Sequence, residues 1–166
     1  MTVLVSLPVL GLALIVQTAI LSRINLLSGS ADLILLILAG WGLQPNAKFV
    51  WVWAGLAGLL VGYVSALPMV VTVAGYLLVM GLARLLQRRI WQAPLLAMFA
   101  VTFAGTLVMQ LLSYIALFFL GNTLPPGDVF LQVILPSTLL NLLLSIPCNA
   151  LMRDLAGWLH PQEAEA

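Results

Sequence analysis

Two sets of uncharged polar side chains recur every four residues within apolar stretches. The first set is Thr102, Thr106, Gln110 and Tyr114, and the second is Ser137, Asn141, Ser145 and Asn149, with Arg153 next in the series. A four-residue interval places each set along one face of a helix. Hydroxyl and amide groups are costly in hydrocarbon without partners, so we expect both faces to point inward or toward a cavity. They could bond each other, line a small-ligand pocket or contact another protein.

The remaining residues offer little for catalysis. The chain has one histidine, His160, five carboxylates, and no common hydrolase, zinc or nucleotide-binding motif. His160 and Asp154 do not share a helix face, and the single cysteine, Cys148, is expected to be a packed thiol. The net charge of +1 gives no footprint for nucleic acid. We therefore expect a non-enzymatic protein without cofactor or metal.

The charges show which elements must carry these polar faces. Charged residues make up 7% of the chain and hydrophobic residues 63%, whereas a typical soluble domain is about 25% charged. No charge falls within residues 1–22, 49–83 or 90–127. A membrane-spanning helix needs about 20 apolar residues to cross about 30 Å of hydrocarbon. The sequence thus predicts an all-α, polytopic integral membrane protein.

Six membrane spans fit the pattern best, forming one bundle over residues 1–158 with a polar tail over 159–166. The predicted spans are residues 3–22, 32–43, 49–66, 69–86, 94–120 and 129–158. The second is short, so we expect it to be tilted, distorted or locally shielded. Asp32 is placed to cap that helix, and Pro68 is placed to begin the fourth after a tight turn. Pro136 and Pro147 predict kinks in the last span.

The basic residues predict a topology. With six spans, one side holds Lys48, Arg84, Arg88, Arg89 and Arg153, and the other holds only Arg23. Because cytoplasmic loops carry the excess of Lys and Arg, both termini are predicted in the cytoplasm. The patch Arg84, Arg88 and Arg89 is expected to anchor this topology and meet anionic headgroups, or to dock a cytoplasmic protein.

Two further expectations concern the membrane interior and its boundaries. No acidic residue is expected deep within a span, which argues against a proton- or cation-coupled transporter. Four tryptophans lie near predicted boundaries, as aromatic belts do: Trp41, Trp51, Trp53 and Trp158.

Small residues recur every four positions in the third span. They are Ala54, Gly58, Gly62 and Ala66, and the two glycines form a GxxxG motif. Such a groove lets another helix backbone approach closely. The approaching helix could belong to the same bundle, or it could be the transmembrane helix of a partner.

Several short motifs, in this order, resemble the bacterial rod shape-determining protein MreD family. They are Val16-Gln17, Ala31-Asp32-Leu33-Ile34-Leu35, the Gly-rich segment Gly58 to Pro68, Gly75-Tyr76-Leu77, the basic loop Arg84–Arg89, and Asn141 to Pro147. The resemblance covers about residues 15–155. The chain departs from the family at two points: Gly62 stands where the family has an aspartate, and Ala31 where it has a proline.

The resemblance implies a membrane scaffold or regulator of cell elongation and peptidoglycan synthesis. The implied partner is an MreC-type single-span protein, whose helix would bind the small-residue groove. The wider complex would include a RodA-type glycosyltransferase, a class B penicillin-binding transpeptidase and, indirectly, the MreB filament.

The family fold also resembles the six-helix substrate-binding subunits of energy-coupling-factor vitamin transporters, and such a subunit is the alternative function. Its pocket would be lined by Thr106, Gln110, Asn141 and Ser145.

Overall fold

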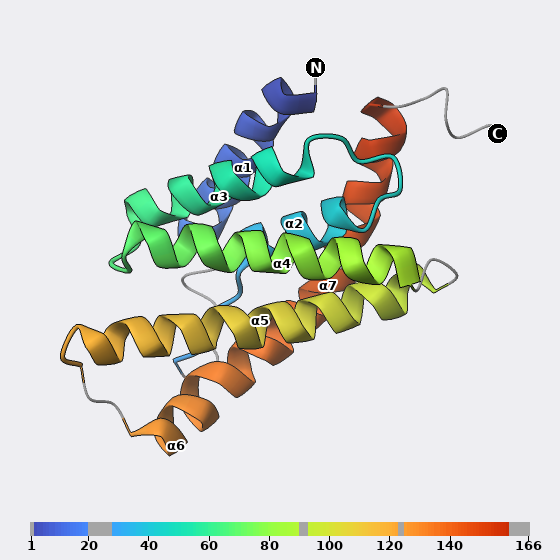
Figure 1. The fold of residues 1–166 in the computed structure, drawn as a ribbon. Helices are drawn as coiled ribbons and strands as arrows, with labels where there is room; N and C mark the ends of the chain where they lie inside the picture. The colour runs from blue at the N-terminus through green and yellow to red at the C-terminus, as the bar shows by residue number, and fades with distance from the viewer. Residues whose placement is uncertain (1, 20–27, 90–92, 123–124, 160–166) are drawn as a thin grey trace.

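The computed structural model describes residues 2–19, 28–89, 93–122 and 125–159, and its regular elements are helices (Figure 1). The elements are α1 (Thr2–Ala19), α2 (Leu33–Gly42), α3 (Val50–Val64), α4 (Met69–Arg89), α5 (Pro94–Phe119), α6 (Pro126–Val129), the π-helical turn η2 (Phe130–Ile134) and α7 (Leu135–Leu159). The all-α prediction is confirmed, and within the described residues each predicted span overlaps one helical segment, the last of them α6, η2 and α7 together. Arg23, His160 and the tail after Leu159 lie outside the described residues.

Three of these segments are long and apolar enough to cross a membrane: Met69–Arg89, Pro94–Phe119 and Pro126–Leu159. By the length and composition of these helices, the chain is a membrane protein. The other apolar helices are shorter, and α2 has only 10 residues. At 1.5 Å per residue, α2 extends about 15 Å, roughly half the thickness of the hydrocarbon.

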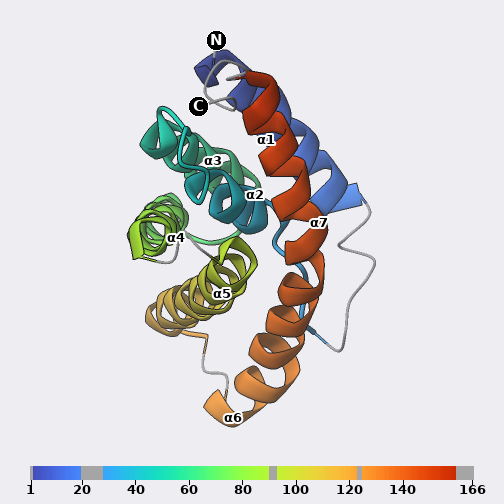
Figure 2. The same ribbon diagram turned by 90° about the vertical axis from the view of Figure 1, so that its right-hand side faces the viewer.

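The short helix α2 forms the centre of the bundle. Nine of its ten residues are buried, from Ile34 to Gly42, as expected of a helix that is apolar all round. It contacts α7, α4, α5, α1 and α3, which surround it in Figure 2. Trp41 of α2 stacks on Trp53 of α3 with ring centroids 4.6 Å apart. Trp41 and Trp53 are buried, so the expectation that they belong to an aromatic belt is wrong. Trp51 and Trp158 are exposed.

Helices α3 and α4 form a hairpin in which α4 packs into the small-residue groove of α3. Met69 begins α4 directly after Pro68, as predicted. A Cβ atom added at Gly58 would lie 2.5 Å from the Cα of Val73, and one at Gly62 would lie 2.6 Å from Oγ1 of Thr72. The Thr72 hydroxyl also donates to the Gly58 carbonyl oxygen at 2.9 Å.

This packing decides between the two interpretations of the groove. Ala54 and Gly58 are buried and Gly62 is half-buried, while Ala66 is exposed beyond the end of α3. The neighbouring helix at this face is α4 of the same chain. Of the two interpretations, packing within the same bundle is therefore the one that the structure supports, because α4 occupies the place that a partner helix would need.

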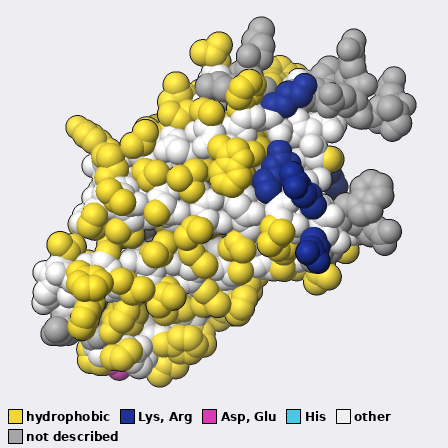
Figure 3. Space-filling view, viewed as in Figure 1, with side chains coloured by type: hydrophobic (Ala, Val, Ile, Leu, Met, Phe, Trp, Pro, Cys, Tyr) yellow, Lys and Arg dark blue, Asp and Glu magenta, His cyan; other side chains and the backbone are white. Residues whose placement is uncertain are grey.

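The basic side chains gather at one end of the bundle, as Figure 3 shows at its right-hand side. Among the described residues they come from the α2–α3 connection, the end of α4 and the last turns of α7: Lys48, Arg84, Arg88, Arg89 and Arg153. Apolar side chains cover most of the rest of that view. The start of α1 and the end of α7 also lie close together in both ribbon views (Figures 1 and 2).

Arg84 differs from the rest of the predicted basic patch because it binds the protein's own backbone. Its guanidinium donates to the carbonyl oxygens of Gln44, at 3.1 Å, and Ala47. These bonds hold the α2–α3 connection, where Phe49 adopts a left-handed φ of 55° that costs a non-glycine residue about 1–2 kcal/mol. Arg88 and Arg89 are exposed. Of the three patch residues, Arg84 is thus assigned to holding the loop.

Arg84→Gln is expected to loosen this connection without unfolding the bundle. The change removes two charge-assisted hydrogen bonds of about 1.5–3 kcal/mol each. Amide hydrogen exchange of residues 43–49 should speed up by at least about ten-fold, while exchange in α2 and α5 stays unchanged. Arg88→Gln removes the same charge from an exposed site and is the control. Equal exchange in the two variants would contradict the role given to Arg84.

Candidate functional site

An extended segment, residues 28–32, leads the chain into the centre of the bundle beside the last helix. The backbone N–H of Ser28 donates to the Gln132 carbonyl oxygen at 3.1 Å. Further in, the N–H of Ser30 donates to Oγ of Ser137 at 3.1 Å, and the N–H of Asp32 donates to Oδ1 of Asn141 at 2.8 Å. These bonds satisfy backbone donors that hydrocarbon could not.

Three local features let the extended segment lie against this helix. Pro136 has no N–H, so it cannot donate to the Gln132 carbonyl oxygen as an α-helix would require, and Ser28 takes that place. The π-helical turn Phe130–Ile134 adjusts the helix just before the proline. Gly29 allows the close approach, because a Cβ atom there would lie 2.7 Å from the backbone nitrogen of Ser137.

Asp32 consequently lies at mid-depth in the bundle. Its partner Asn141 is about 22 Å along the helical segment Pro126–Leu159, near the middle of its 34 residues. Asn141 in turn donates through Nδ2 to Oγ1 of Thr106 at 2.9 Å, and Thr106 is near the middle of α5. The prediction that no acidic residue lies deep within a span did not anticipate this position, because Asp32 precedes the first residue of α2 and that helix begins at mid-depth in the bundle.

The carboxylate of Asp32 joins two helices that are distant in sequence. Oδ1 accepts the N–H of Leu35 at 3.0 Å, which makes Asp32 the N-cap of α2 as predicted. Oδ2 accepts the hydroxyl of Tyr76, on α4, at 2.9 Å. The positive end of the α2 dipole also favours a negative charge here. Oε1 of Gln17, on α1, accepts the N–H of Ile34 at 3.3 Å.

A polar cavity of about 230 Å³ adjoins this cluster. Its polar lining comes from α1, the segment before α2, the α3–α4 turn, α4 and α5: Gln17, Ser30, Asp32, Ser65, Thr72, Tyr76, Gln110 and Ser113. The apolar part of the wall is Ala31, Val61, Leu67 and Met109. An ionisable side chain beside a polar cavity within a bundle marks a candidate functional site.

The structure separates the polar residues that the sequence grouped as one pocket. Thr106 and Asn141 are buried and bond each other, while Ser145 donates back to the Leu142 carbonyl oxygen of its own helix at 2.6 Å. Only Gln110 of the four expected pocket residues lines the cavity. The predicted lining is thus wrong in three positions, because Thr106 and Asn141 bond each other between helices and Ser145 bonds a carbonyl oxygen of its own helix.

The other members of the two polar faces have separate surroundings. Thr102 is buried, and its hydroxyl has no hydrogen-bond partner within the described part of the chain. Ser137 binds the extended segment, and Tyr114 is half-buried toward the end of α5. Asn149 is buried next to a second cavity at the basic end of the bundle.

The arrangement suits the binding of a polar molecule. The described residues that line the cavity offer one carboxylate together with hydroxyls and amides. No group of three or more metal-binding side chains occurs in the part of the chain that was described. A small polar molecule or ordered water would find several hydrogen-bonding groups here.

Sequence reasoning missed Asp32 as the centre of the site, although one signal was present. The polar stretch Ser28-Gly29-Ser30 directly precedes an apolar run too short to cross a membrane. A short run after a glycine-containing polar stretch indicates a discontinuous helix whose end lies inside the bundle.

Comparison of the chain with protein families, curated proteins and solved structures finds no match.

Proposed function

We propose that this chain is a non-enzymatic membrane scaffold or regulator of the bacterial cell-elongation machinery. In this proposal it crosses the inner membrane six times, with both termini in the cytoplasm, and binds the transmembrane helix of an MreC-type single-span protein. The wider assembly contains a RodA-type glycosyltransferase and a class B penicillin-binding transpeptidase, and the MreB filament is reached indirectly.

One observation carries the proposal: motifs that resemble the MreD family meet at one point. Asp32, Tyr76 and Asn141 come from three of these motifs and form a continuous hydrogen-bonded cluster. A fourth motif supplies Gly58, which packs on the helix that carries Tyr76. Residues that form one structural unit are more informative than isolated matches in apolar sequence.

Gly62, which stands where the family has an aspartate, lies next to the polar cavity. A Cβ atom at Gly62 would face Oγ1 of Thr72, and Thr72 lines the polar cavity. The family's aspartate would therefore stand next to this cavity. In this chain Asp32 is the carboxylate that lines it.

Since α4 fills the small-residue groove, the partner helix must bind a different, lipid-facing surface. Large apolar side chains are exposed on several helices and provide such surfaces. Examples from three sides are Leu4 on α1, Val70 on α4 and Leu143 on α7, each at least 70% exposed. These positions suit photo-crosslinking, because side chains that contact little within the bundle tolerate replacement.

The second candidate is a substrate-binding subunit of an energy-coupling-factor vitamin transporter. The cavity of about 230 Å³ beside Asp32 favours it, because a small polar ligand could be held by Gln17, Gln110 and Ser113. That reading requires a bound small molecule and a partner ATPase.

The first test is a gentle-detergent pull-down of the tagged protein from its native membranes, read by mass spectrometry. Recovery of an MreC-type protein with the glycosyltransferase and transpeptidase is the expected result. A photo-reactive residue at position 4, 70 or 143 should then crosslink that partner from one side only. Recovery of transporter ATPases and a coupling subunit in their place would overturn the scaffold proposal.

A further inference from the structure

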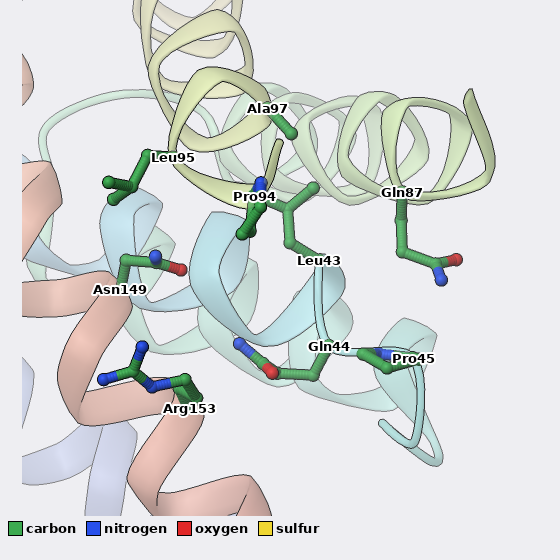
Figure 4. Close-up of a pocket in the computed structure, with 9 residues that line it drawn as sticks. All are labelled: Leu43, Gln44, Pro45, Gln87, Pro94, Leu95, Ala97, Asn149 and Arg153. Atoms are coloured by element: carbon green, nitrogen blue, oxygen red, sulfur yellow. The ribbon is translucent and has the colours of Figure 1, made fainter. Parts of the chain in front are cut away.

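A second cavity, of about 400 Å³, opens at the basic end of the bundle. Its walls come from the α2–α3 connection, the end of α4, the start of α5 and the last turns of α7. Figure 4 shows Gln44, Gln87, Asn149 and Arg153 around it, with Pro94 and Leu95 forming part of the apolar wall. It is separate from the polar cavity beside Asp32, with which it shares no lining residue.

The start of α5 gives this cavity a preference for anions. The helix has 26 residues, and Ala93 at its N-cap provides no side-chain hydrogen bond. The first backbone N–H groups of a helix lack partners within it and carry the positive end of its dipole. Pro94 has no N–H, and that of Ala97 donates to the Ala93 carbonyl oxygen. The donors at this start are therefore those of Leu95 and Leu96. Pro94 and Leu95, the first two residues of α5, lie in the cavity wall. An anion at this helix start would be bound favourably.

Asn149 supplies an independent indication that the cavity holds a ligand. Its side chain is only 8% exposed, and it faces the cavity near Leu95 and Arg153 in Figure 4. It makes no hydrogen bond to other residues in the described ranges, unlike Asn141 two turns earlier. The amide of this buried residue faces the cavity, where a ligand oxygen could accept its hydrogen bond.

Arg153 adds a positive charge at the mouth of the cavity. It lies one turn beyond Asn149 on α7, with its side chain 71% exposed. Its Nε atom is 3.8 Å from the Asp154 carboxylate, a long contact between exposed groups that contributes little. The terminal nitrogens of a guanidinium match the geometry of a phosphate group.

We propose that this cavity binds the phosphate group of an anionic membrane phospholipid. The phosphate would lie between Asn149, Arg153 and the start of α5, and the glycerol end of the lipid would lie along Leu43 and Leu95. The volume exceeds that of a phosphate alone, and the apolar wall favours a lipid over a soluble phosphate compound. The surrounding basic patch draws anionic lipids to this end of the protein.

Native mass spectrometry of the full-length protein in detergent, titrated with phosphatidylglycerol or phosphatidylcholine, tests the proposal. Phosphatidylglycerol is expected to bind in a one-to-one complex, and Arg153→Gln and Asn149→Leu should each weaken that binding by about ten-fold. Arg88→Gln removes an equal charge from an exposed site outside the cavity, so its affinity should stay within about two-fold of the unchanged protein. Thermal unfolding of each variant checks that it is folded. If Asn149→Leu does not fold, Arg153→Gln still tests the proposal, because the exposed Arg153 side chain can be replaced without disturbing the core.

Two results would overturn the proposal. Equal weakening by Arg88→Gln and Arg153→Gln would show that only diffuse charge attracts the lipid. Displacement of phosphatidylglycerol by millimolar inorganic phosphate, with direct phosphate binding that Arg153→Gln abolishes, would assign the cavity to a soluble phosphate compound. Neither result depends on whether the protein is an elongation scaffold or a transporter subunit.

Discussion

Replacing Asp32 by alanine is expected to destabilise the protein by about 2–4 kcal/mol, whereas Asp32→Asn should retain most of the stability. Alanine removes the N-cap of α2, worth about 0.5–2 kcal/mol, and leaves the buried Tyr76 hydroxyl without its acceptor, at a cost of about 1–3 kcal/mol. Asparagine keeps an oxygen that accepts from Leu35. Because α2 is the centre of the bundle, the loss should reach all the helices that pack on it.

Unfolding of the purified protein in detergent, by heat or by denaturant, measures these differences. Asp128→Ala removes an exposed acid and serves as the control. Tyr76→Phe is expected to cost less than Asp32→Ala, and the double variant should cost less than the sum, because the two side chains share one hydrogen bond. If Asp32→Ala unfolds like Asp128→Ala, Asp32 does not hold the bundle together and its place beside the cavity needs another explanation.

The helices themselves were predictable because the physical signal is large. A charge-free stretch of about 20 residues satisfies its own backbone hydrogen bonds in hydrocarbon as a helix, so the positions of α4, α5 and the last helix follow from composition. Pro68 and Asp32 mark helix starts by chemistry that acts within a few residues. Such local rules do not depend on knowing the neighbours.

The depth of Asp32 was not predictable by the same rules, because it depends on contacts between distant segments. A capping aspartate has the same local sequence whether its helix begins at the membrane surface or in the middle of the bundle. What places it at mid-depth is the pairing of residues 28–32 with Gln132, Ser137 and Asn141, more than 100 positions away. The four-residue spacing predicted which side chains share a face, but not which of them would pair and which would line a cavity.

The small-residue groove shows a related limit. Gly58 and Gly62 indicate that a helix backbone comes close, and the motif is the same whether that helix is in the same chain or in a partner. The turn at Pro68 decides the matter, because it returns α4 directly along α3. An intramolecular neighbour joined by a short turn occupies the groove before any partner can.

Gly58→Leu is therefore expected to disrupt the bundle, and Gly55→Leu on the same helix is expected to be tolerated. At position 58 even the first added atom would lie 2.5 Å from the backbone of Val73, which cannot move aside as a side-chain tip can. Overpacking typically costs about 1–3 kcal/mol, and a clash with backbone should cost at least the upper value. At Gly55 an added Cβ atom meets nothing within 4 Å.

The pair of variants separates the two roles that the groove could have. If α4 fills it, Gly58→Leu should lower the unfolding temperature or yield by far more than Gly55→Leu, with or without any partner present. Gly55→Leu should be neutral or slightly stabilising, since leucine is a better helix former than glycine by up to about 1 kcal/mol. Should Gly58→Leu unfold like the unchanged protein and lose only the co-purified partner, then α3 would pack on α4 less tightly than described, and the groove would be the partner's binding site after all.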